Sequence, residues 1–456
     1  MDQWKISITK GPQDWQVLQQ KNGLANIALE GTWTVDNDLP GAVYARAVRE
    51  DTGEGILPWT PAEVCGDHAW RAVLEGVPAG GLYRLETGFA QQGLVLLECM
   101  QHGDMVHHVA VGDLYVIAGQ SNSAGFGKDM VYDPPELGVH LLRNSGRWDI
   151  ATHPMNDATA TVHPANREGW NPGHSPWLTF AKMVKRETGI PVGLVQTALG
   201  GSLLSEWLPG GKLYANMADI IASAGGAVRG VLWYQGCSDT SFPQCGTYLD
   251  RFNCFVNALR DAVGDPNLPF ITVQISRYVA GGPDETGDLA WSIVREAQRQ
   301  AAQQIPGVWL VPSMDCTLSD AIHISAVSNM ALGERAGRIA LARLYGRRSA
   351  ADAPDVERAV KTQDGILLKY RNISLRVYVL DVPADKLPFR LEDELGEVKI
   401  SAYEQPGPCE LLLKPARPIY GRCAVSGHYG RDPHGQPVID TGTRLIAPAF
   451  YGVVAD

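Results

Sequence analysis

The sequence predicts a central α/β domain between two β-rich domains. From residue 111 to about 348, short apolar runs alternate with segments of helical periodicity. Residues 1–110 and 349–456 instead contain short strand-like runs between frequent turn residues. Because alternating apolar strands and helices are typical of a parallel sheet covered on both faces, we expect a three-layer α/β/α domain flanked by two β-sandwich-like domains.

The first predicted domain spans residues 1–110. Turn residues, such as the Pro-Ala-Gly-Gly segment at 78–81, separate its expected strands. These strands are 33–35, 42–47, 69–74 and 93–97. Short strands with closely spaced turns favour a sandwich.

The central domain, residues 111–348, begins with a buried strand over 114–118. Its other strands are expected at 192–197, 228–234, 269–275 and 308–311, and its helices at 177–188, 213–224, 248–263, 290–304 and 328–345. Gly189 is typical of a helix C-terminal cap, and Pro191 prevents the first helix from continuing. Each helix therefore returns the chain to the next parallel strand.

The third predicted domain, residues 349–456, follows a polar, Pro-containing segment at 350–354 that is typical of a domain edge. Its strands are expected at 366–370, 375–380 and 410–413, with turns at 363–365 and 433–435. This pattern favours a second small sandwich. The roles of the two β-rich domains are open and include dimerisation, so the sequence allows a homo-oligomer.

Composition and charge exclude several classes of protein. The net charge of −11 argues against a nucleic-acid or anionic-membrane partner. No apolar run approaches a membrane span, and the N-terminus lacks the apolar core of a signal peptide, so we expect a cytoplasmic protein, with secretion as the alternative. The eight cysteines are scattered without metal-ligand spacing. We therefore expect free thiols, no metal and no cofactor, with a Cys245–Cys254 disulfide as the alternative.

A serine follows the first central strand directly. The segment Gly119-Gln120-Ser121-Asn122 turns the chain at the carboxyl end of a buried strand, where open α/β sheets form their sites. Ser121 is therefore a candidate nucleophile. The alternative is that Ser121 and Asn122 are ordinary turn and cap residues. The segment is not the Gly-x-Ser-x-Gly elbow of α/β-hydrolases, so that fold is not predicted.

A candidate base and its partner lie near the end of the central domain. Asp320 and His323 precede the last helix and can face the same sheet edge as Ser121. A helix cap and a surface histidine are the alternatives. Gly200 and Gln235 follow the second and third strands and could donate to an oxyanion, or could be a plain turn and a loop-ordering amide. Convergence on one sheet edge predicts an active site.

These segments resemble the SGNH (GDSL-like) hydrolases and, within them, the sialate O-acetylesterase-like carbohydrate esterases. The matching stretches, in family order, are 112–122, 174–181, 191–194, 200–207, 233–236, 320–323 and 332–335. The resemblance implies an SGNH-type fold with Ser121 as nucleophile, His323 as base and Asp320 as the partner of His323. It also implies an oxyanion hole built from the N–H groups of Ser121 and Gly200 and the side chain of Gln235, with no metal.

The sequence departs from the family pattern at two positions. Ser123 stands where the family often has Met, and Cys237 where it usually has Glu. Asn122 and Trp207 are expected beside the substrate, with core packing as the alternative for Trp207. The implied enzyme removes O-acetyl groups from a carbohydrate, sialic acid or a plant or microbial glycan, through an acetyl-enzyme. The alternatives are an esterase for non-sugar acyl esters and a carbohydrate-binding protein with a degenerate site.

Overall fold

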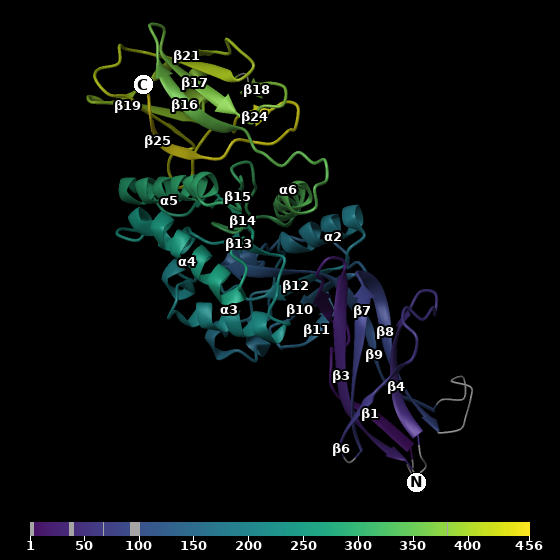
Figure 1. Cartoon of the computed structure of the whole chain (residues 1–456). Helices are drawn as coiled ribbons and strands as arrows, with labels where there is room; N and C mark the ends of the chain where they lie inside the picture. The colour runs from purple at the N-terminus through teal and green to yellow at the C-terminus, as the bar shows by residue number, and fades with distance from the viewer. Residues whose placement is uncertain (1–3, 36–40, 67, 92–100, 381) are drawn as a thin grey trace.

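The computed structural model describes residues 4–35, 41–66, 68–91, 101–380 and 382–456. Figure 1 shows a central region of helices and strands between a β-rich N-terminal region and a β-rich C-terminal region. The α/β character of the centre and the β-rich character of both flanks are as predicted. The strand expected at 93–97 lies outside the described residues, as does Cys99.

The central sheet has the strand order β11-β10-β12-β9-β13-β14-β15. Its parallel strands are β10 (Val139–Leu142), β12 (Val192–Gln196), β9 (Gln101–Gly119), β13 (Gly230–Tyr234), β14 (Phe270–Val273) and β15 (Val308–Val311). The edge strand β11 (Trp148–Ile150) pairs with β10 in the antiparallel direction. Every residue of β12, β13 and β14 is buried, which explains their uninterrupted apolar sequences.

Helices pack on both faces of this sheet. They are α2 (Trp177–Thr188), α3 (Lys212–Ser223), α4 (Tyr248–Val263), α5 (Glu285–Gln304) and α6 (Ala326–Leu344). Phe180 of α2 packs edge-on against Tyr115 of β9, and Phe255 of α4 packs against Trp233 of β13, with ring centroids 4.9 and 4.7 Å apart. Because Trp233 pairs with Ala118, Tyr115 and Trp233 lie on opposite faces of the pleated sheet. Helices α2 and α4 therefore cover opposite faces; α6 contacts α2, while α3 and α5 contact α4.

Strand β9 belongs to both the N-terminal and the central region. Its first half pairs with β8 (Gly80–Gln91), and its second half lies between β12 and β13. The boundary predicted between residues 110 and 111 therefore falls inside one strand. The strands β2 (Val17–Gln19), β4 (Gly41–Arg49) and β5 (Thr60–Pro61) extend this sheet.

A second N-terminal sheet has the order β1-β3-β7-β6. Its strands are β1 (Trp4–Lys10), β3 (Leu24–Val35), β7 (Ala69–Pro78) and β6 (Glu63–Gly66). Leu29 and Leu74 from this sheet join Val43 and Leu85 from β4 and β8 in one buried cluster. The two sheets therefore share a core that is separate from the core of the central region.

The C-terminal region contains two four-stranded sheets and a short two-stranded ladder. Their strands are β16 (Asp355–Lys361), β17 (Ile366–Arg371), β22 (Glu410–Pro415) and β21 (Ile400–Glu404); β20 (Gly396–Val398), β19 (Phe389–Asp393), β23 (Ala424–Gly427) and β25 (Phe450–Val454); and β18 (Val377–Tyr378) with β24 (Ile439–Asp440). The two larger sheets share a buried core. Arg299 of α5 pairs with Asp355 at 3.0 Å, and both side chains are about nine-tenths buried, so this ion pair fastens the region to the centre.

Two further observations concern the cysteines and the membrane. Cys245 and Cys254 are free thiols, so the alternative disulfide between them does not form. Across the described ranges, no helix combines the length and apolar character needed to cross a bilayer.

Candidate active site

Ser121 opens the short helix α1 (Ser121–Ala124) directly after β9. Gly119 precedes this turn with a φ of 116°, and a Cβ on it would lie 2.3 Å from the carbonyl oxygen of Tyr234. The turn therefore requires glycine. Gln120 donates its backbone N–H to the same carbonyl at 2.9 Å, which fixes the turn against β13. The N–H of Ser121 lies in the first turn of α1, where a helix has no internal acceptor for it.

Asp320 and His323 form a hydrogen-bonded pair. The Nδ1 atom of His323 lies 2.7 Å from Oδ2 of Asp320, while Oδ1 accepts from the backbone N–H groups of Ile322 at 2.9 Å and His323 at 2.8 Å. Burial by itself would raise the pKa of Asp320, but the hydrogen bonds from His323 and the two N–H groups lower it. The ionised carboxylate holds the proton on Nδ1, so Nε2 is the basic nitrogen of the ring.

Asn122 connects the serine turn to the histidine loop. Its Nδ2 donates to the carbonyl of Ile322 at 3.2 Å, and its Oδ1 accepts from the N–H of Ile324 at 3.0 Å. These two residues flank His323, and Asn122 follows Ser121, so one side chain brings the predicted nucleophile and base to the same sheet edge. Asn122 was expected beside the substrate, but both ends of its amide bind the histidine loop.

Gly200 lies beside the site with a carboxylate as its neighbour. A Cβ on Gly200 would lie 2.6 Å from Oε2 of Glu168 and 3.1 Å from the ring of Phe126. The Phe126 ring in turn lies 5.4 Å from the His323 ring, centroid to centroid. Burial raises the pKa of Glu168, while hydrogen bonds from the Asn156 amide and the Gly200 N–H partly oppose that rise. The N–H expected to stabilise an oxyanion therefore faces Glu168, a residue that no sequence pattern beyond its acidity marked as part of the site.

The Gln235 side chain is fully buried and has a different role from the expected one. Its Nε2 donates to the Ser202 carbonyl at 3.1 Å and to Oδ2 of Asp239 at 2.6 Å, and its Oε1 accepts from the Tyr248 hydroxyl at 3.1 Å. A primary amide has two N–H groups, and both are used here. None remains for an oxyanion, so the structure supports the loop-ordering alternative.

Trp207 lies in the core. Its ring is fully buried, packs edge-on against Trp233 with centroids 5.4 Å apart, and donates its N–H to the Ser202 hydroxyl at 3.1 Å. A buried ring has no face available to a sugar. The expectation of a substrate contact at Trp207 is therefore corrected to core packing.

Both departures from the family pattern are accommodated without a new reactive group. The buried Ser123 hydroxyl donates to the Ala118 carbonyl at 2.8 Å and accepts from the Trp177 indole at 3.0 Å. Burial raises the pKa of the Cys237 thiol to about 12, so this thiol stays protonated at neutral pH. Neither change therefore introduces a second candidate nucleophile.

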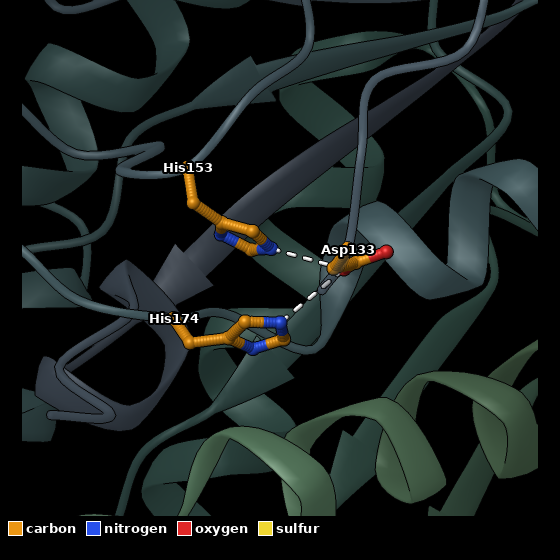
Figure 2. A group of neighbouring side chains, drawn as sticks. All are labelled: Asp133, His153 and His174. Carbon is orange, nitrogen blue, oxygen red and sulfur yellow. Dashed lines mark hydrogen bonds and ion pairs between the residues drawn. The ribbon is translucent and has the colours of Figure 1, made fainter. Parts of the chain in front are cut away.

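A cluster of two histidines and an aspartate, absent from the sequence expectations, lies nearby. In Figure 2, His153 and His174 both point toward Asp133. Their Nε2 atoms lie 3.1 and 3.2 Å from its Oδ2, and their rings stack with centroids 3.9 Å apart. Lys182 of α2 forms an ion pair with Oδ1. Burial would raise the pKa of Asp133, but these three partners hold it well below its usual range.

The residue types of this cluster are ones that can hold a metal ion. Two observations favour a structural role instead. The Lys182 ammonium already balances the Asp133 carboxylate and would lie beside any ion bound there. The backbone N–H of Ser175 approaches Nδ1 of His153 at 3.4 Å, which leaves the ring proton on Nε2, where it is donated to Asp133. His174 also exchanges backbone hydrogen bonds with Gly127, so the cluster supports the wall of the site next to Phe126.

Comparisons with known proteins identify the family. Residues 111–342 match the family described as carbohydrate esterase, sialic acid-specific acetylesterase. A probable carbohydrate esterase of Arabidopsis thaliana is 32% identical over 243 residues, which span 48% of this chain and 86% of that protein. The solved structure of a carbohydrate acetylesterase from Xanthomonas citri matches 99% of both chains with a TM-score of 0.67 and 20% identity, which shows a shared fold. The chain therefore belongs to the carbohydrate esterase family of the sialic acid-specific acetylesterases, and it is a carboxylic ester hydrolase.

Proposed function

We propose that this chain is a serine esterase that removes O-acetyl groups from a carbohydrate. The observation that supports it most is the hydrogen-bonded Asp320–His323 pair, which Asn122 ties to Ser121 at the carboxyl end of β9. Family membership supports the class of bond that is cleaved. In this proposal the central region is a three-layer α/β/α domain of SGNH type and the flanking regions are sandwiches, as the helices on both sheet faces and the two separate β-region cores suggest.

The first half of the reaction transfers the acetyl group to the enzyme. Oγ of Ser121 attacks the acetyl carbonyl carbon while Nε2 of His323 accepts the hydroxyl proton. The bond between the carbonyl carbon and the sugar oxygen then breaks, and Nε2 returns the proton to that oxygen. Asp320 fixes the tautomer of His323 and stabilises the imidazolium that forms.

The second half of the reaction releases acetate. A water molecule attacks the acetyl-enzyme carbonyl while Nε2 of His323 takes its proton. The ester bond to Ser121 breaks, and the proton returns to Oγ. The same nitrogen therefore serves as base and acid in both halves, and the enzyme is regenerated.

The negative oxygen of each tetrahedral intermediate needs hydrogen-bond donors. We assign the N–H groups of Ser121 and Gly200 to this role. Donation from Gly200 requires the oxyanion to displace the carboxylate of Glu168, which faces that N–H. The Gln235 amide contributes by holding the loop after β13, since both of its N–H groups are used.

Acetate release from a panel of acetylated glycans tests the proposal. Sialic acid, xylan, mannan and pectin acetates would be incubated with wild type, Ser121→Ala and the matched control Ser223→Ala, an exposed serine at the end of α3. We expect release by wild type and the control and none by Ser121→Ala. Equal release by Ser121→Ala would contradict the serine mechanism. Turnover of aryl acetates without release from any glycan would contradict the carbohydrate assignment.

A further inference from the structure

The segment from Glu168 to Asn171 is fixed at both ends next to residues of the proposed site. At one end, Glu168 lies against Gly200. At the other, Asn171 accepts a hydrogen bond from the Lys128 ammonium, which also lies 5.2 Å from the centroid of the Phe126 ring. The Phe126 ring lies next to both Gly200 and His323, so both anchors lie close to residues of the proposed site.

Trp170 lies inside this anchored segment. Its Cα lies within about 8 Å of the Glu168 Cα, because consecutive Cα atoms are 3.8 Å apart. Trp170 is 59% exposed, whereas every other tryptophan whose exposure the structure describes is buried or half-buried. A large ring left in water loses the stabilisation that burial would give. Its place in a segment anchored beside the proposed site suggests that a ligand covers it.

We propose that Trp170 is the platform on which the sugar ring of the substrate stacks; this inference rests on the proposed esterase function. A pyranose ring has a face of C–H groups that packs well against a flat aromatic ring, while its hydroxyl groups point outward. An indole offers a wide, rigid face at a low cost in side-chain entropy. Glu168 and Lys128, which fix the two ends of this segment, carry an acceptor and a donor suited to sugar hydroxyl groups.

The experiment compares Trp170→Ala and Trp170→Phe with wild type on two substrates. One is an acetylated oligosaccharide that wild type cleaves, and the other is ethyl acetate, which has no sugar ring. We expect Trp170→Ala to lower kcat/KM for the oligosaccharide roughly tenfold, mainly through KM, and to leave ethyl acetate hydrolysis within about twofold. Trp170→Phe keeps an aromatic face and should recover most of the loss. Tyr420→Ala, an equally exposed aromatic residue in the C-terminal region, is the matched control.

A binding measurement separates recognition from chemistry. In a Ser121→Ala background, titration calorimetry with the same oligosaccharide should show weaker binding when Trp170→Ala is added. If Trp170→Ala leaves cleavage and binding of the oligosaccharide equal to those of the parent proteins, the proposed role of Trp170 is wrong, and the esterase proposal is unaffected. An equal loss on ethyl acetate would also overturn that role, since that result means a structural defect. If wild type releases acetate from no glycan, the proposed function fails and the platform fails with it.

Discussion

Two aspartates with lowered pKa lie in and beside the site, and their partners differ. Asp320 is bound by His323 and backbone N–H groups and keeps 38% of its side chain exposed, whereas Asp133 is almost fully buried with Lys182 and two histidines. The first arrangement orients the ring of the proposed base, His323, at low cost to the fold. The second makes the fold depend on the negative charge. Replacing each aspartate should therefore affect different properties of the enzyme.

We expect Asp320→Asn to lower kcat by roughly 10³- to 10⁴-fold, because an amide cannot hold the His323 tautomer or stabilise its imidazolium. The melting temperature should change little, since Asp320 is partly exposed. Steady-state kinetics on an acetylated substrate, together with thermal unfolding, would check both expectations. A kcat within tenfold of wild type would show that Ser121 and His323 act as a dyad without Asp320.

Asp133→Asn should destabilise the protein by about 3–5 kcal/mol, because it leaves the buried Lys182 ammonium without its counter-charge. The pKa of Asp133 is lowered on folding, so its contribution to stability is fully present above its unfolded pKa of about 4 and is lost as pH falls below that value. The free energies of unfolding of wild type and Asp133→Asn, measured in urea, should therefore converge at acid pH. Adding Lys182→Met to Asp133→Asn should restore part of the lost free energy of unfolding. If the effects of the two substitutions on that free energy simply add, Asp133 and Lys182 are not coupled.

At the scale of elements, the site depends on how a strand end meets a loop from the far end of the domain. The turn after β9 and the histidine loop are about 200 residues apart in sequence, and Asn122 joins them through two hydrogen bonds. Reactive groups must be positioned to within a fraction of an ångström, so a looser loop slows the chemistry more than it weakens substrate binding.

Asn122→Ala removes both of these hydrogen bonds without changing the chemical identity of Ser121 or His323. We expect kcat to fall by about 10- to 100-fold with a smaller change in KM. Backbone amides at 320–324 should exchange faster with deuterium, as measured by mass spectrometry. Asn257→Ala, on the exposed face of α4, is the matched control. Unchanged kcat and unchanged exchange would contradict a positioning role for Asn122.

At the scale of the whole molecule, β9 makes one structural unit of the N-terminal and central regions. The strand pairs with β8 in one region and with β12 and β13 in the other. Unfolding of either region therefore disrupts a strand that belongs to the other. The C-terminal region has its own core and meets the centre through α5, including the Arg299–Asp355 pair. We therefore infer that the first two regions unfold together and that the third unfolds separately.

Core truncations in each region test this cooperativity by calorimetry. Leu29→Ala in the N-terminal core and Val116→Ala in β9 should lower the midpoint temperature of the same unfolding transition. Leu413→Ala should lower the midpoint temperature of a different transition. Each leucine truncation should cost about 2–5 kcal/mol, because it removes buried methyl groups and leaves a cavity. A separate low-temperature transition in Leu29→Ala would show that the N-terminal region unfolds alone.

The sequence predicted the features that local patterns encode. Buried parallel strands carry uninterrupted apolar runs, so β12, β13, β14 and β15 lie where expected. The pairing of Asp320 with His323 spans three residues and was likewise predictable. The short strands β10 and β11 were missed, because three or four residues between Pro, Gly and Asn turns show no clear periodicity.

Contacts between distant segments could not be predicted. The Gln235 amide is used by Ser202, Asp239 and Tyr248, whose convergence depends on three-dimensional packing. Asp133, His153 and His174 follow one another at intervals of 20 and 21 residues, too far apart for any local spacing rule to relate them. The continuity of β9 was missed because the change from β-rich to α/β sequence occurs in the middle of that strand.

The central claim, that Ser121 carries the acetyl group between substrate and water, is tested most directly by trapping the intermediate. Wild type would be mixed with a saturating acetyl ester, quenched in acid during turnover, and examined by mass spectrometry of the intact protein and its peptides. We predict one added acetyl group, located on Ser121 and absent from Ser121→Ala. Acetate release with no acetyl group on Ser121, or with the acetyl group on another residue, would contradict the claim.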